Sequence, residues 1–118
     1  MAQDETEERH LLHCDLHSDN SLADGARITG IIDWGNASYG DPLYDVAWLG
    51  RVTPLGTRLV DRALLDAQYG AAPRYRERLA CYEIALGLDD LRYFAKNGER
   101  ERYDAMRAVL LPLATMGD

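Results

Sequence analysis

The segment "HCDLHSDN", residues 13–20, gathers side chains of the types that do chemistry in proteins. It holds two histidines, a cysteine, two aspartates and an asparagine. Imidazole, thiolate and carboxylate groups bind metals or move protons, and an amide oxygen can complete a cation site. A second carboxylate, Asp33 in "IIDWG", stands where it could share a cation with Asn20. The segment is therefore a candidate catalytic loop, with a metal site and a polar turn as the alternatives.

Short β-type runs must position these side chains. "LLH" is typical of the end of a short buried strand, and residues 13–20 follow it as a loop. "SLA" and "RITGIID" are two further runs, and the Asp-Gly pair between them indicates a tight hairpin turn. Because a hairpin reverses the chain, we expect Asp15, Asn20 and Asp33 to converge on one cleft.

Four helices are expected after a loop at "WGNASYG". The first begins at Asp41, a good N-cap, with Pro42 in its first turn. The others are predicted over about 57–69, 73–98 and 100–113, with a bend at Gly87 left open. Helical spacing predicts one shared core for Leu79, Tyr82, Leu86, Met106 and Leu110. The fold class is α+β.

Three segments carry a family resemblance: "LLHCDLHSDN", "GIIDWGNASYGDP" and "YDVAWL". Together they resemble the aminoglycoside phosphotransferase and choline kinase superfamily, closely over residues 11–50. The spacing His13-x-Asp15-x-x-x-x-Asn20, with Asp33-Trp-Gly after a strand, has the layout of a kinase catalytic loop and metal motif. The resemblance implies a protein-kinase-like C-terminal lobe, in which a β-hairpin and the catalytic loop pack on a mainly helical bundle.

The resemblance also implies a reaction, ATP-dependent transfer of phosphate to the hydroxyl of a small molecule. Asp15 would orient or deprotonate the acceptor. Asn20 and Asp33 would bind Mg²⁺, which prefers a few protein oxygens together with water and nucleotide phosphates. The expected supporting residues are His13, Asp41 and Asp45.

The acceptor would be an aminoglycoside-like or amino-alcohol compound. The acidic balance of the chain agrees weakly with a cationic acceptor. Glu83, Asp89 and Asp90 are candidates to contact such a cation, although acidic residues on helices more often form a solvated face.

The sequence departs from the family pattern at several points. Cys14 stands where the family usually has glycine, and Ser18 and Asp19 stand where Pro-Gly is frequent. Only twelve residues precede His13, and the single lysine is Lys96. We therefore expect an acidic segment at 1–10, a catalytic-loop lobe at 11–118 and no nucleotide-binding N-lobe, so the isolated chain should be inactive or weakly active.

Composition limits the possible partners. The 118 residues carry a formal charge of −7, which argues against nucleic acid as a partner. No apolar stretch has the length needed to span a membrane, and two cysteines are too few for a disulfide scaffold, so we expect a cytoplasmic protein.

Two other functions stay open. One is a catalytically silent binding or assembly module that keeps the shape of the lobe. The other is a zinc site at His13, Cys14 and His17. The surface that a second lobe would cover favours a homo-oligomer if the chain acts alone.

Overall fold

The structure, a computed structural model, describes residues 9–54 and 56–115. Small β elements come first and helices follow, as predicted. Strand β1 (His10–Leu12) pairs antiparallel with β4 (Ser38–Gly40). This pairing corrects the loop predicted at 34–40, because its last three residues form a strand. The first eight residues of the predicted acidic segment lie outside the described residues.

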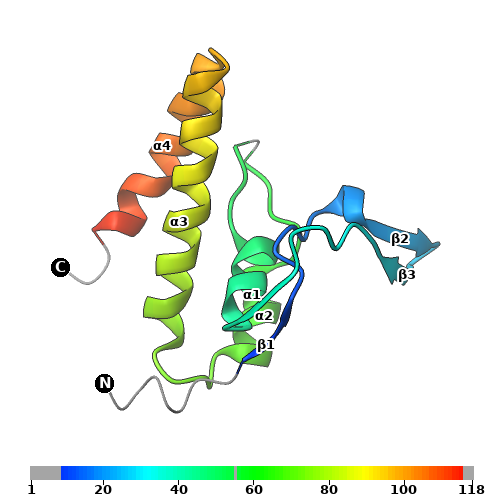
Figure 1. The fold of residues 1–118 in the computed structure, drawn as a ribbon. Helices are drawn as coiled ribbons and strands as arrows, with labels where there is room; N and C mark the ends of the chain where they lie inside the picture. Colours follow the sequence, from blue (N-terminus) through cyan, green and yellow to red (C-terminus); the bar gives the residue numbers. More distant parts are fainter. Residues whose placement is uncertain (1–8, 55, 116–118) are drawn as a thin grey trace.

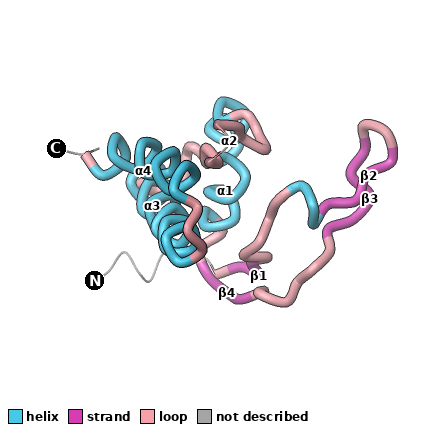
Figure 2. The backbone as a smooth tube through the Cα atoms, turned by 90° about the horizontal axis from the view of Figure 1, so that it is seen from above, coloured by secondary structure: helices cyan, strands magenta, loops and turns pink. Residues whose placement is uncertain are grey.

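The predicted hairpin is confirmed. A short 3-10 helix, η2 (Ser18–Asn20), leads into β2 (Ser21–Asp24), which pairs antiparallel with β3 (Arg27–Ile31). Gly25 has a φ of +60°, the left-handed value that glycine reaches without steric cost in a two-residue turn. The hairpin projects away from the helices (Figure 2).

Four helices make up the rest of the described chain: α1 (Leu43–Gly50), α2 (Arg62–Tyr69), α3 (Tyr75–Lys96) and α4 (Arg100–Ala114). No strand occurs in the described residues after Gly40, in agreement with the helical prediction. The helix predicted over 57–69 begins five residues late, because the Asp61 side chain accepts the Ala63 N–H and caps α2 there. None of the described helices is long and apolar enough to cross a membrane.

Helices α3 and α4 lie side by side over much of their length (Figure 1). Gly87 lies within α3, which runs uninterrupted from Tyr75 to Lys96. A Cβ at Gly87 would overlap the side chain of Leu110 on α4. Gly87 is therefore a point of close helix contact and not the site of a helix break.

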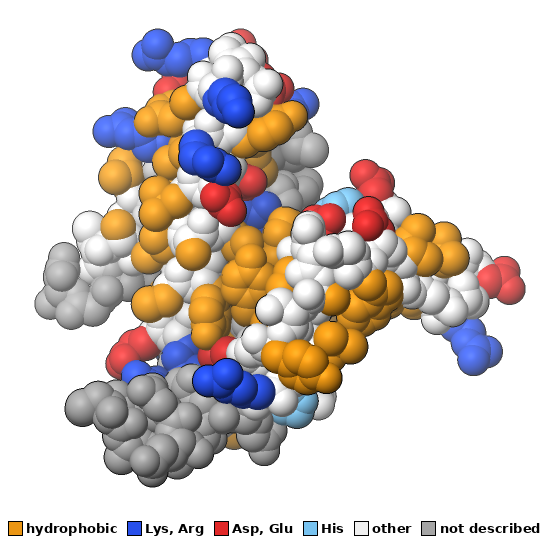
Figure 3. All heavy atoms as spheres, viewed as in Figure 1, with side chains coloured by type: hydrophobic (Ala, Val, Ile, Leu, Met, Phe, Trp, Pro, Cys, Tyr) orange, Lys and Arg blue, Asp and Glu red, His pale blue; other side chains and the backbone are white. Residues whose placement is uncertain are grey.

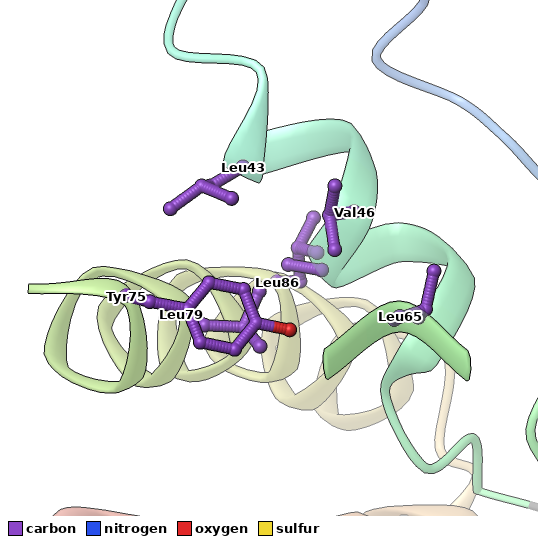
Figure 4. Packing of buried hydrophobic residues seen from close by; sticks show 7 residues of the cluster. Leu43, Val46, Leu65, Tyr75, Leu79 and Leu86 are labelled. Carbon is purple, nitrogen blue, oxygen red and sulfur yellow. The ribbon is translucent and has the colours of Figure 1, made fainter. Parts of the chain in front are cut away.

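The core consists of two clusters. The larger one joins α1, α2 and α3 through Leu43, Val46, Leu65, Tyr75, Leu79 and Leu86 (Figure 4). The smaller one joins α3 and α4 through Phe94, Met106 and Leu110. The single shared core predicted from helical spacing is thus wrong, since Leu79 and Leu86 belong to one cluster and Met106 and Leu110 to the other.

Candidate active site

His13 anchors the candidate catalytic loop. Its side chain is buried, with 1% of the residue exposed. The Asp15 backbone N–H donates to His13 Nδ1 at 3.1 Å, and His13 Nε2 lies 2.7 Å from the carbonyl oxygen of Ile32. A neutral ring with its proton on Nε2 satisfies both contacts. His13 therefore ties the loop to the end of the hairpin.

Asp45 on α1 holds the start of the same loop. Its Oδ2 accepts the His13 N–H at 2.8 Å, and its Oδ1 accepts the Cys14 N–H at 3.0 Å. Burial raises the pKa of the Cys14 thiol, and the nearby Asp45 charge adds to the rise. A raised pKa disfavours the thiolate form, which makes Cys14 a poor nucleophile.

Asp15 and Asn20 are in direct contact. The buried Asn20 amide donates from Nδ2 to the Asp15 carbonyl oxygen at 2.9 Å and to Asp15 Oδ2 at 3.3 Å. His17 Nε2 lies 3.3 Å from Asp15 Oδ1 and 3.3 Å from Asn20 Nδ2. The NH₂ group of the Asn20 side chain faces Asp15, so its amide oxygen, Oδ1, is the atom suited to bind a cation.

Asp33 follows β3 in the hairpin. The Ile32 N–H donates to the backbone carbonyl oxygen of Asn20 at 2.9 Å. Asp33 is the next residue after this contact. Asp33 has a φ of +62° and an exposed side chain. Trp34 beside it packs against His13, with ring centres 4.6 Å apart. The hairpin thus returns to the loop at Asn20, as the sequence predicts, and the convergence of the three side chains on one cleft stays a prediction.

Asp41 binds α3, whereas Asp45 binds the loop. Arg78 donates to both Asp41 oxygens, from Nη2 at 2.6 Å and Nε at 3.0 Å, and the Tyr82 hydroxyl donates at 2.8 Å. Asp41 Oδ1 also accepts the Leu43 N–H at 3.1 Å at the start of α1. Burial opposes ionisation of Asp41, but these hydrogen bonds outweigh it and lower the pKa of the carboxyl. Asp41 therefore positions α1 against α3.

The three acidic candidates for acceptor binding lie in different surroundings. Glu83 is buried and pairs with Arg62 at 3.0 Å, and burial raises the pKa of its carboxyl. Asp89 is exposed on α3. Asp90 lines a cavity of about 370 Å³ that also includes His17 and Ser18 of the loop. Only Asp90 among the three therefore lies in a cavity wall together with loop residues.

This cavity contains residues that sequence reasoning did not select. Besides the loop and Asp90, its lining includes Trp48, Arg51, Thr53, Pro54, Thr57, Leu59, Phe94 and Arg102. Trp48 lies on α1 and Arg51 is the residue that ends it. Residues three apart are neighbours on a helix surface, so this spacing was a sequence signal that the two side chains could act together.

The zinc alternative finds no support in this geometry. Both ring nitrogens of His13 make contacts within the fold. Among residues 9–54 and 56–115, no group of three or more His, Cys, Asp or Glu side chains is placed to hold a metal ion. The kinase-type Mg²⁺ site differs, because it uses an amide oxygen and nucleotide phosphates beside carboxylates.

The fold and the loop define a kinase-like phosphotransferase class. A model of the phosphotransferase enzyme family matches residues 2–82, and the chain belongs to that family. A solved structure of a thermostable mutant of aminoglycoside phosphotransferase APH(4)-Ia, apo form, matches with a TM-score of 0.73 and 31% identity. That match covers 99% of this chain and 41% of the other, and it confirms the predicted fold class.

Two curated relatives are similar in sequence. Hygromycin-B 4-O-kinase of Escherichia coli is 38% identical over 97 residues, which cover 76% of this chain and 26% of that protein. Homoserine kinase of Methylobacillus flagellatus is 31% identical over 91 residues, which cover 73% of this chain and 28% of that protein. The chain spans roughly a quarter of the length of these relatives.

Proposed function

We propose that this chain is the catalytic-loop lobe of an ATP-dependent phosphotransferase that acts on a hydroxyl group of a small molecule. The observation that carries the proposal is a pair of contacts made by Asn20. Its side-chain amide donates to Asp15, and its backbone carbonyl oxygen accepts the Ile32 N–H. These contacts link a candidate base, a candidate metal ligand and the residue before Asp33. The named activities of the relatives, a hygromycin-B kinase and a homoserine kinase, are both phosphoryl transfers.

In this proposal Asp15 is the catalytic residue. The acceptor oxygen attacks the γ-phosphorus of ATP, the bond to the β–γ bridging oxygen breaks, and ADP leaves. The proton of the acceptor hydroxyl passes to the Asp15 carboxylate. Asn20 and His13 hold the Asp15 backbone from two sides, which fixes the carboxylate for this step.

Asn20 and Asp33 supply oxygen donors suited to Mg²⁺, which when bound would neutralise phosphate charge. We expect weak Mg²⁺ binding without nucleotide, because two or three protein oxygens seldom hold this ion alone. Calorimetry that shows tight Mg²⁺ binding in the absence of ATP would contradict this part of the proposal.

Exposed apolar side chains on the hairpin indicate that another protein surface covers them. Leu22, Ile28, Ile32 and Trp34 are between 43% and 65% exposed on and beside the hairpin. Figure 3 shows hydrophobic side chains on the surface of this projecting part. We propose that a second copy of the chain covers them, the alternative being a nucleotide-binding lobe. Light scattering that reports a monomer at micromolar concentration would exclude the homo-oligomer.

ATP use and two free cysteines, Cys14 and Cys81, fit a reducing compartment, and we propose the cytoplasm. The rival function is a silent binding or assembly module with the same lobe shape. Both functions predict a folded chain, so turnover separates them.

Phosphorylation of a panel of hydroxyl compounds by the chain with Mg²⁺-ATP, read by ³¹P NMR, tests the proposal. Asp15→Asn should lower the rate by two or more orders of magnitude, because general-base catalysis contributes about 10²–10⁴-fold. Asp19→Asn is the matched control, since Asp19 is an exposed aspartate of the same loop. A residual rate that Asp15→Asn leaves unchanged supports the silent module.

A further inference from the structure

The cavity beside the loop has a size and position suited to the acceptor. Its volume of about 370 Å³ falls within the range of small-molecule sites. Loop residues Leu16, His17 and Ser18 form one wall. The Nε2 atom of His17 lies 3.3 Å from Asp15 Oδ1. A ligand that contacts His17 in this cavity is therefore one side chain away from the carboxylate proposed as the base.

The groups that would recognise a cation in this cavity are already occupied. Asp90 is the one carboxylate among the described lining residues, and its Oδ2 lies 2.6 Å from Arg51 Nη1. The guanidinium carbon of Arg51 also lies 5.0 Å from the centre of the Trp48 ring. A carboxylate and an aromatic face are the groups that bind an ammonium ion best. A cationic ligand would have to displace Arg51 from both.

Arg102 is the second arginine of the lining. Its Nη1 lies 3.5 Å from Glu99 Oε1, and its side chain is 58% exposed. An ion pair this exposed contributes little, so it does not prevent Arg102 from pairing with a ligand. Two arginines and one aspartate give the described lining a formal charge of +1 with His17 neutral. The charge favours an anionic group on the ligand.

We infer that the acceptor bound in this cavity carries a carboxylate besides its reacting hydroxyl, an inference that rests on the proposed function. The carboxylate pairs with Arg102, while the Arg51–Asp90 pair excludes polycations. This reverses the cationic preference that the overall charge of the chain suggests. The charges that line the cavity determine the ligand preference, because exposed charges farther away than the Debye length, about 8 Å at physiological salt, are screened.

Binding of three probes to the full chain, followed by NMR, tests the inference. The probes are homoserine, its carboxamide, which keeps the hydroxyl and the ammonium, and hygromycin B as the polycation. Homoserine should shift the indole N–H signal of Trp48 and bind about fivefold tighter than the carboxamide, as expected for one partly exposed ion pair. The Trp34 signal serves as an internal control, since Trp34 does not line the cavity.

Substitutions test the roles of Arg102 and Arg51 one at a time. Arg102→Gln should abolish the preference for the carboxylate and Arg102→Lys should keep it. Arg92→Gln, an exposed arginine on α3 outside the cavity, should change nothing. Arg51→Gln should release Asp90 and Trp48 and raise the affinity for hygromycin B about fivefold or more.

Tighter binding of the carboxamide or of hygromycin B by the unmodified chain overturns the inference. The same holds if homoserine leaves the Trp48 signal unmoved. These measurements need no nucleotide and no turnover. A carboxylate preference in a chain whose phosphate transfer does not depend on Asp15 would therefore count against the proposed function and leave the binding preference standing.

Discussion

Asp45 Oδ1 accepts the backbone N–H of Cys14 at 3.0 Å, and the residue it holds has a φ of +70°. A side chain with a Cβ is strained at this angle by roughly 1–2 kcal/mol, whereas glycine adopts it freely. The Asp45 bonds to His13 and Cys14 hold the loop in this conformation. Glycine would therefore suit this position better than cysteine does.

Cys14→Gly should raise the free energy of unfolding by about 0.5–1 kcal/mol. The substitution relieves the backbone strain, but glycine also raises the conformational entropy of the unfolded chain, which offsets part of the gain in stability. Urea denaturation at pH 7 measures it. Cys14→Ala keeps the Cβ and should show no such gain, so equal stabilisation by both substitutions would refute the strain argument.

Asp45→Asn should destabilise the chain by about 1–3 kcal/mol, because one of the two loop N–H groups loses its acceptor. Hydrogen exchange should speed up at the amides of His13 and Cys14 in particular. Asp89→Asn, an exposed position on α3, is the control and should change neither quantity. Unchanged exchange at these amides in Asp45→Asn would show that the loop is held by other contacts.

Asp41 should make stability depend on pH at the acid end. Its pKa is lower in the folded chain, because hydrogen bonds from Arg78, the Leu43 N–H and Tyr82 outweigh the effect of burial. A carboxyl of this kind adds stability above its unfolded pKa of about 3.9, and this stability is lost as the pH falls through the folded value.

The expected result is that Asp41→Asn lowers stability at pH 7 and that its deficit shrinks from about pH 5 downward. Urea denaturation of both chains between pH 7 and pH 3 checks it. Asp19→Asn, at an exposed loop position, should run parallel to the unmodified chain. A deficit that stays constant over this range would show that the Asp41 charge contributes nothing.

Gly87→Ala should destabilise the contact between α3 and α4. Although alanine favours a helix by about 1 kcal/mol, its Cβ overlaps the side chain of Leu110. Overpacking of this kind costs about 1–3 kcal/mol. In a double-mutant cycle, Leu110→Ala should remove most of the penalty, so additive effects in thermal denaturation would contradict the overlap.

The β-hairpin and the helices were predictable because their signals are local. The Asp24-Gly25 pair sets the turn, Asp41 and Pro42 start α1, and helical spacing marks α3 and α4. The start of α2 was missed although Asp61 is a good capping residue, since the apolar pattern was extended too far toward the N-terminus. Strand β4 was missed because three residues owe their strand form to pairing with β1.

The return of the hairpin to the loop at Asn20 was predictable from the sequence, because the loop and the hairpin follow each other within a short stretch of chain. Tertiary structure decided the partners of the other charged residues. Asp45 holds the loop, Asp41 binds Arg78, Glu83 pairs with Arg62, and Asp90 with Arg51. The latter three pairs, like the separation of the core into two clusters, depend on how distant helices pack. Local sequence patterns carry no information about such contacts, because they fix which face of a helix is apolar but not which neighbour covers it.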